Sequence, residues 1–235
     1  MKLHAGTSGF AYKKWKGPFY PADLADAEML RYYAERLGSV EINNTFYRMP
    51  KRAVVKSWAE QVPDGFVFVI KASRRITHQA RLKDVDDPLG FLHQSLLELG
   101  PHLGPVLFQL PPFLRKDVPR LRDFLAAVPE PLRPVLEFRH ASWDDDEVRK
   151  TLRDANAALC ISDAEGEADP ELLSTADFGY LRCRREGYDE PTLAALAERI
   201  AAQPWREAYC FFKHEDGGAA AKQAMQLTEA FGSGR

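Results

Sequence analysis

The feature of this chain that most constrains its fold is a regular alternation of short apolar runs with longer segments of helical periodicity. The runs are rich in Val, Ile, Leu and aromatic residues, which is typical of parallel strands buried on both faces. They lie at residues 3–7, 40–42, 66–72, 106–110, 135–138, 158–161, 178–183 and 208–212. Eight such units in 235 residues predict one α/β domain over residues 1–235, a (β/α)8 TIM barrel.

Helix signals fill the gaps between these runs. Helical periodicity is found at residues 24–37, 51–61, 89–99, 117–128, 147–155, 193–202 and 219–231, whereas 170–173 is expected to be a turn or a short helix. We expect Pro50 in a first helical turn, Gly38 just beyond a helix end, and Ser142 in a capping box with Asp145. A doubly wound open sheet is the alternative fold, but Gly-Thr-Ser-Gly at 6–9 is not its phosphate-binding fingerprint.

Composition argues against several classes of protein. A formal net charge of −2, with no long block of one sign, is not typical of a general nucleic-acid or membrane-surface binder. The first residues lack the apolar run of a signal peptide, and no stretch is long enough to span a bilayer, so we expect a cytoplasmic protein. Cys160, Cys183 and Cys210 form no Cys-x-x-Cys pair and are expected to be reduced and buried.

Polar side chains occur at the carboxyl ends of the predicted strands, most of them at every second position and therefore on one face. They are Glu41, Asn43, Lys71, Gln109, Glu137, Arg139, Asp163, Arg182 and Lys213. Helices cover the outside of a barrel, so an outward charge there would be buried without water, at a cost of several kcal/mol. We therefore expect these side chains to point into a shared cavity, and Cys183 and Cys210 to point outward.

The predicted cavity contains more cations than anions. Its cations are Lys71, Arg139, Arg182 and Lys213, and its anions are Glu41, Glu137 and Asp163. The excess predicts a small anionic ligand, because arginines bind carboxylate or phosphate in bidentate fashion. Gly217 and Gly218 before the last helix either add backbone N–H donors for an anion or only turn the chain. The alternative to a functional site is an internal salt-bridge network that only stabilises the barrel.

Aromatic residues near the strand ends are further candidates for ligand contact. Tyr12 and Trp15 follow the first strand, Tyr47 follows the second, and Trp143 follows the fifth. They are expected either to contact the ligand or to form a satellite hydrophobic cluster.

Three histidines, His78, His140 and His214, lie past strand ends, where each could serve as a general acid or base. A metal site is weakly signalled, because no His-x-His motif or close acidic cluster is present. We therefore predict no metal and no other cofactor.

Several short motifs together resemble a known family. They are GTSGF at 6–10 with Trp15, FYP at 19–21, VEINNTFY at 40–47, KA at 71–72 with ITH at 76–78, LFQLPP at 107–112, EFRH at 137–140 with SW at 142–143, and TADF at 175–178. In order and over almost the whole chain, they resemble the YecE-like family, domain of unknown function 72. The resemblance implies a TIM barrel without an assigned reaction, and it favours His78 among the histidines.

Two segments depart from the pattern of that family. Arg184-Arg185 stands where such families tend to carry a histidine–glycine pair, and Lys213-His214 stands where they tend to carry two asparagines. The edge of the cavity formed by the last two strands is therefore expected to differ in this chain.

We weigh three functions. The favoured hypothesis is an enzyme acting on a phosphate- or carboxylate-bearing molecule, with Glu41 or Glu137 as general base and the cations stabilising negative charge. Lys71 is alternatively a Schiff-base nucleophile, if burial and neighbouring cations lower its pKa. The second hypothesis is a non-catalytic binding or regulatory barrel. The third is a nucleic-acid-processing, endonuclease-like barrel, against which the chain lacks a basic surface excess. The sequence leaves the oligomeric state open.

Overall fold

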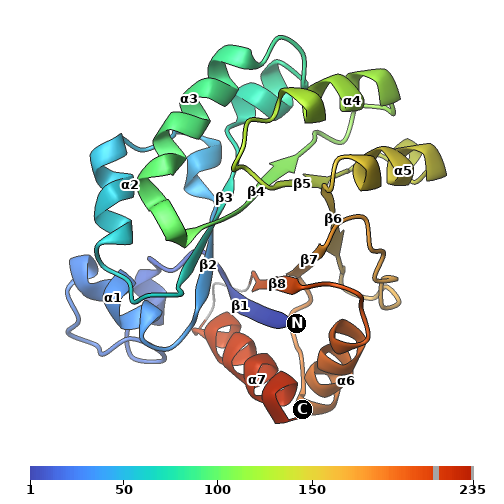
Figure 1. Ribbon diagram of the computed structural model, residues 1–235. Coiled ribbons are helices and arrows are strands. Elements are labelled where there is room, and N and C mark those ends of the chain that lie inside the picture. Colours follow the sequence, from blue (N-terminus) through green and yellow to red (C-terminus); the bar gives the residue numbers. More distant parts are fainter. Residues whose placement is uncertain (214–216, 234–235) are drawn as a thin grey trace.

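The computed structural model describes residues 1–213 and 217–233, and its strands close into a barrel with helices outside (Figure 1). All neighbouring strands pair in parallel, in chain order, and the last pairs with the first. The strands are β1 (Lys2–Ser8), β2 (Ser39–Ile42), β3 (Val67–Lys71), β4 (Leu103–Gln109), β5 (Pro134–Glu137), β6 (Ala158–Ser162), β7 (Phe178–Cys183) and β8 (Glu207–Phe212). The predicted barrel of eight parallel strands is confirmed.

The helices are α1 (Met29–Ala34), α2 (Arg52–Ala59), α3 (Asp86–Leu96), α4 (Val118–Ala127), α5 (Asp146–Asp154), α6 (Glu190–Ala201) and α7 (Ala219–Ser233). They follow the strands in turn, except that residues 163–177 between β6 and β7 contain no helix, so 170–173 is not helical. A loop occupies this place between α5 and α6 in Figure 1. Within the described ranges, no helix is both long and apolar enough to cross a membrane.

Three predicted helix boundaries are wrong. Pro50 precedes the N-cap residue of α2, Lys51, so it lies outside the first turn. Asp145, not Ser142, caps α5, because its carboxylate accepts hydrogen bonds from the first free N–H groups of the helix. The helix α1 ends at Ala34, so Gly38 is not its C′ residue.

The predicted alternation of inward and outward side chains is confirmed. One buried cluster fills the barrel interior and consists of Val67, Val69, Leu107, Val135, Ala158, Cys160, Phe178, Tyr180, Tyr209 and Phe211. A second, larger core lies between strands and helices, and it contains Cys183 and Cys210. All three cysteines are free and buried, as predicted. The inward side chains beyond this apolar interior are the polar ones near the carboxyl ends of the strands.

The contact between β1 and β2 depends on a glycine. A Cβ atom on Gly6 would lie 2.0 Å from the backbone oxygen of Ser39, so no other residue fits between these strands without moving them. Two residues further on, Ser8 pairs in register with Glu41. The close approach of the two backbones thus places the first two polar side chains of the barrel mouth side by side.

Candidate functional site

Glu41 lies at the bottom of the polar mouth and is fully buried. Its Oε1 accepts hydrogen bonds from Ser8 Oγ at 2.7 Å and Asn43 Nδ2 at 2.8 Å, and its Oε2 accepts one from Tyr180 at 2.5 Å. Arg182 Nη2 lies 2.8 Å from Oε1. Burial alone would raise the pKa of Glu41, but Arg182 and these donors hold that pKa below its usual range. Glu41 is therefore a saturated, ionised acceptor.

Glu137, on the opposite side of the mouth, is bound by three guanidinium groups. Arg182 Nη1 lies 2.9 Å from its Oε2, while Arg184 Nη2 at 2.9 Å and Arg139 Nη2 at 2.6 Å share its Oε1. The amide of Gln109 donates to Oε2 at 2.8 Å. One carboxylate balances only one unit of charge, so this cluster remains cationic.

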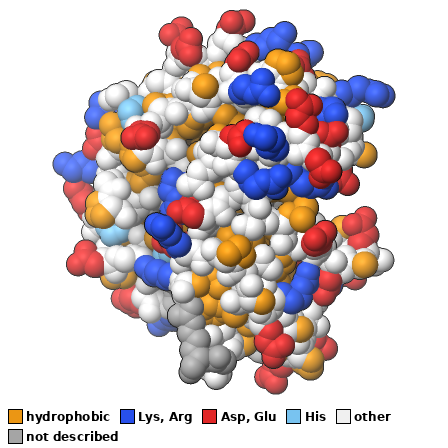
Figure 2. Space-filling view, turned by 45° about the vertical axis from the view of Figure 1, so that its right-hand side comes forward, with side chains coloured by type: hydrophobic (Ala, Val, Ile, Leu, Met, Phe, Trp, Pro, Cys, Tyr) orange, Lys and Arg blue, Asp and Glu red, His pale blue; other side chains and the backbone are white. Residues whose placement is uncertain are grey.

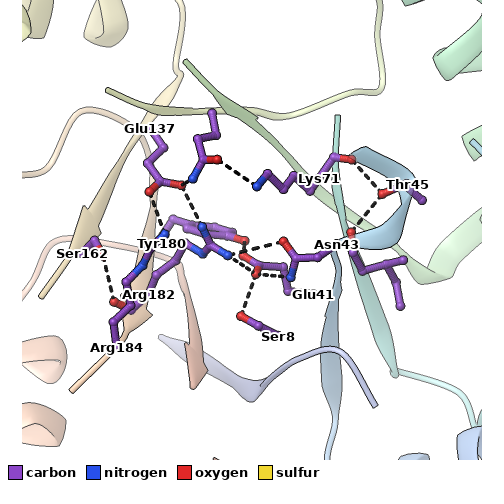
Figure 3. Close-up of polar contacts among 12 residues, drawn as sticks. Ser8, Glu41, Asn43, Thr45, Lys71, Glu137, Ser162, Tyr180, Arg182 and Arg184 are labelled. Atoms are coloured by element: carbon purple, nitrogen blue, oxygen red, sulfur yellow. Dashed lines mark hydrogen bonds and ion pairs between the residues drawn. The ribbon is translucent and has the colours of Figure 1, made fainter. Parts of the chain in front are cut away.

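Arg182 connects the two carboxylates and is itself buried, with its guanidinium lying between Glu41 and Glu137 (Figure 3). Burial opposes its charge, but the two carboxylates outweigh burial and raise its pKa. Breaking a buried pair of this kind by removing one partner costs about 3–5 kcal/mol. Arg182 thus fixes β2, β5 and β7 relative to one another at the carboxyl face.

Lys71, the last residue of β3, is a half-buried cation of the mouth. Its Nζ donates to Gln109 Oε1 at 2.9 Å and lies 4.4 Å from the centroid of the Phe46 ring. Among the described residues, no carboxylate oxygen lies within 4.0 Å of Lys71 Nζ. Burial and the neighbouring Arg182 lower the pKa of Lys71 to about 8, although Glu137 and Glu41 act in the opposite direction. Its ammonium and amine forms therefore coexist near neutral pH.

The backbone of Lys71 is held by the turn that follows β2. Thr45 Oγ1 lies 2.7 Å from the carbonyl oxygen of Lys71 and 3.0 Å from that of Ile42. Thr45 is buried, so this contact between the ends of β2 and β3 is shielded from water. It fixes the end of β3, from which the Lys71 side chain extends.

A cavity of about 350 Å³ opens above these residues. It is lined by Ser8, Tyr12, Asn43, Phe46, Tyr47, Lys71, Gln109, Arg139, Arg182, Arg184 and Lys213. Among the described residues, five that line it are cationic and none is a carboxylate, since Glu41 and Glu137 lie beneath them. Counting both carboxylates, the described part of the mouth carries five positive and two negative side chains, an excess of three positive charges. We name this space the mouth cavity.

The predicted aromatic residues fall into two groups. Tyr12 and Tyr47 line the mouth cavity, and Tyr47 is 74% exposed at its rim. Trp15 is completely buried beside Phe19, so it belongs to the satellite hydrophobic cluster and its predicted ligand contact is wrong. Trp143 is also buried, with its indole N–H bound to the backbone of the loop after β4, and it lies outside the mouth cavity.

Asp163 was expected in the shared cavity, and this placement is wrong. It follows β6, whose inward residues are Ala158, Cys160 and Ser162, so its position faces the other way. Its Oδ1 accepts from the backbone N–H of Arg184 at 2.6 Å, and its Oδ2 accepts from the hydroxyl of Tyr188. Asp163 therefore connects the ends of β6 and β7 rather than balancing the mouth cations.

Two of the three predicted histidines, His78 and His140, lie in the described part of the chain. The ring of His78 packs edge-on against Phe46 at 4.9 Å, and its Nδ1 lies 2.9 Å from Thr77 Oγ1. Burial, Lys71 and Arg74 lower the pKa of His78, which favours the neutral ring. His140 binds Ser142 through Nδ1. His214 lies outside the described residues, and Lys213, the neighbouring prediction, lines the mouth cavity.

Sequence reasoning missed two residues of the site. Arg184 continues the inward alternation after Arg182, so parity would have found it. Ser8 carries no charge and gave no signal of its own. Tyr180, expected on the inward face of its strand with Arg182, and Phe46, an aromatic candidate beside Tyr47, both lie at the mouth. Gly217 and Gly218 have φ values of 58° and 71°, which a turn requires, and their role toward an anion stays a prediction.

Among residues 1–213 and 217–233, no three His, Cys, Asp or Glu side chains gather closely enough to hold a metal ion. The two buried carboxylates of the mouth, Glu41 and Glu137, are bound by arginine. That no cofactor is used stays a prediction.

Comparison with known proteins gives a consistent result. The family described as "Protein of unknown function DUF72" matches residues 4–235. The UPF0759 protein YecE of Escherichia coli is 37% identical over 115 residues, which cover 48% of this chain and 42% of that protein. The UPF0759 protein YunF of Bacillus subtilis is 28% identical over 133 residues, 53% of this chain and 47% of that protein. The matched segments thus span less than half of either relative.

Solved structures agree on the fold. A DUF72 family protein from Thermotoga maritima superposes with a TM-score of 0.83 at 26% identity, covering 97% of this chain and 98% of that one. A DUF72 family protein from Enterococcus faecalis gives 0.81 at 19% identity, covering 98% and 95%. A xylose isomerase-like TIM barrel/4-hydroxyphenylpyruvate dioxygenase fusion protein gives 0.57 at 14% identity, covering 98% of this chain and 42% of that one, and it shows the fold alone.

Proposed function

Since the chain belongs to the DUF72 family, whose function is unknown, we propose a function from its own site: it is an enzyme that acts on a small phosphate- or carboxylate-bearing molecule bound in the mouth cavity. One observation carries this proposal. Within the described ranges, five cations line the cavity, while the two carboxylates closest to them, Glu41 and Glu137, are buried beneath and fully engaged. A network built only for stability would be expected to balance its charges, because uncompensated buried charge is costly. An anionic ligand would supply the missing negative charge.

The arginines suit the binding role. Arg139 is exposed at the cavity rim, and Arg184 keeps a buried Nε without a hydrogen-bond partner among the described residues. Burial lowers the pKa of Arg184 even though Glu137 lies beside it, which indicates incomplete compensation of its charge. A guanidinium stays charged throughout the physiological range and binds phosphate or carboxylate through two N–H groups. Arg139 and Arg184 are therefore the proposed anion-binding pair.

Lys71 is the proposed reactive group. A catalytic acid or base works best with a pKa near the working pH, and burial beside other cations is a known means of bringing a lysine there. The pKa of about 8 meets this condition, and Lys71 lines the same cavity as the arginines. Glu41 and Glu137, already engaged by four donors each, position Arg182 and Gln109 in this proposal.

A thermal-shift screen of phosphorylated and carboxylated metabolites, with and without divalent metals, tests the binding step. We expect one class to raise the melting temperature of the wild type, because a ligand at 100 times its Kd adds about 2.7 kcal/mol. Arg139→Ala should abolish the shift, and Arg206→Ala, an exposed arginine far from the mouth, should preserve it. No shift with any class, or an equal shift with Arg139→Ala, would contradict the proposal.

The lowered pKa of Lys71 favours one reaction type, imine formation with an anion that also carries a carbonyl group. The neutral amine attacks the carbonyl carbon, a C–N bond forms, and the carbonyl oxygen leaves as water with the two amine protons. Borohydride then reduces the C=N bond to a stable amine, which mass spectrometry locates. We expect the adduct on Lys71 and not on Lys213, and its absence from Lys71 would exclude this reaction type.

A further inference from the structure

The wall of the barrel opens between β5 and β6. These strands pair at only two positions, Val135 with Ala158 and Leu136 with Leu159, whereas β7 and β8 pair at six. Past the two pairs between β5 and β6, β5 ends at Glu137 and β6 continues to Ser162 without pairing to it. The helix that connects β5 to β6, α5, reaches this gap from outside through Val148 and Leu152, and the connection after β6 contains no helix. Figure 2, in which this side comes forward, shows an indentation in the surface.

A cavity of about 470 Å³ occupies this gap. Side chains from both faces of the strands line it: Glu137, Cys160 and Ser162 point into the barrel, whereas Phe138 and Leu159 belong to the outer core. A space bounded by both faces of a sheet passes through the sheet. We name it the lateral cavity.

The lateral cavity adjoins the mouth cavity at the two arginines already assigned to anion binding. Arg139 and Arg184 line both spaces. Arg184, whose buried Nε has no hydrogen-bond partner among the described residues, therefore lies at the junction of the two spaces. A ligand whose charged group lies between these arginines has room to continue outward between the strands.

The walls of the lateral cavity differ from those of the mouth. Phe138 stacks on Trp143 with ring centroids 4.5 Å apart, and Val148, Leu152 and Leu159 complete an apolar side. The rest of the lining is polar or charged and includes Ser162, His140, Asp144, Arg149 and Asp163. The lateral cavity thus has one apolar and one polar side, and its volume lies within the usual range for sites that bind organic ligands.

We propose that the ligand of the mouth is an organic anion with a ring-sized, largely apolar portion, which occupies the lateral cavity while the charged group binds Arg139 and Arg184. This inference rests on the proposed function, since it takes the anion site as given. It specifies the substrate class further: a phosphate or carboxylate carrying a flat organic group, not a bare inorganic anion.

Calorimetric titration with inorganic phosphate and with phenyl phosphate tests the inference. The phenyl ester should bind the wild type at least about tenfold more tightly, because its ring is removed from water. Ala164→Trp places a bulky side chain in the lateral cavity, from a loop position outside the strands. It should lower phenyl phosphate affinity to that of inorganic phosphate and leave the latter unchanged. Ala168→Trp, an exposed position in the same loop, is the matched control and should change neither.

The outcomes separate the two proposals. Equal affinities of the wild type for both probes would overturn the lateral site and leave the anion site standing. Binding of neither probe would overturn both. An equal loss in Ala168→Trp would show that the loop, and not the cavity, governs affinity, and would also overturn the lateral site. If Ala164→Trp does not fold, Leu159→Ala removes apolar wall instead and should weaken only phenyl phosphate.

Discussion

The barrel contains two polar layers, one at each end, and they differ in charge balance. At the amino ends of the strands, Glu207 accepts from Arg133 Nη1 at 2.7 Å, His4 Nε2 lies 3.3 Å from it, and the hydroxyl of Tyr209 donates at 3.1 Å. At the carboxyl ends, the residues that the structure describes include five cations and two carboxylates around the mouth cavity. The lower layer pairs one anion with one permanent cation, whereas the upper layer leaves positive charge in excess.

The polar layer at the amino ends of the strands is also closely packed by aromatic rings. The ring of His4 stacks on Tyr209 with centroids 4.7 Å apart, and Arg133 lies over the ring of Phe178 at 4.1 Å. Burial and the nearby Lys2 lower the pKa of His4, so its ring is neutral at pH 7 and the pair of Arg133 and Glu207 is balanced. The comparison teaches that buried charge inside a barrel does not by itself indicate a binding site. The proposed anion site is supported instead by an excess of positive charge next to a cavity.

The largest expected difference concerns stability. Arg182→Met leaves Glu41 buried without a cationic partner among the described residues, and we expect a loss of about 3–5 kcal/mol in the free energy of unfolding. Arg133→Met removes a pair in which the side chains are 35% and 30% exposed, so the expected loss is about 1 kcal/mol. Urea unfolding of both variants measures the difference, and equal losses would contradict the contrast between the layers.

The next effect concerns anion affinity and pH. Sulfate is the useful ligand, because its own charge is constant over this range. Lys71 is protonated below its pKa of about 8 and loses its charge above it, so sulfate affinity should fall by about tenfold between pH 7 and pH 9.5. Lys71→Gln should bind more weakly at pH 7 and show no such fall. Lys213→Gln, on the cavity rim, is the control that should keep the pH dependence, and calorimetry measures all three.

The smallest effect is expected at the lower layer. The pKa of His4 is lowered in the folded state, so the unfolded chain binds more protons, and stability should decline as the pH falls from above 6.5 through the lowered pKa. Glu207, whose pKa is also lowered because Arg133 and His4 outweigh burial, acts in the same direction at more acidic pH. His4→Gln should lose part of the dependence between pH 7 and pH 5, measured by urea unfolding. An unchanged dependence would remove His4 from this account.

Much of the candidate site could be predicted because strand parity is a local property. Glu41, Lys71, Gln109, Glu137 and Arg182 were placed correctly by their spacing within apolar runs. Asp163 was misplaced because it was assigned by its position at the end of a strand, whereas the alternation along β6, with Ala158 and Cys160 inward, turns it away from the mouth. Trp15 was misjudged because exposure of a loop aromatic depends on what packs over it.

Distances between strands could not be read from the chain. The contact of Arg182 with Glu41 joins residues 141 positions apart, and that of Tyr180 with Glu41 joins residues 139 apart. The sharing of Glu137 by three arginines depends on how β5 and β7 approach across the mouth. Nothing in the local pattern specifies which cation meets which carboxylate.

The sequence by itself determined the eight parallel strands, the inward face of each, and the gathering of charged residues at one end, because periodicity and burial act along the chain. The tertiary structure alone decided the charge balance, by burying Glu41 and Glu137 beneath the cations, and it alone opened the wall between β5 and β6. The charge balance depends on the closure of the barrel, which brings distant strand ends within hydrogen-bonding distance, and the opening depends on the short pairing of β5 with β6.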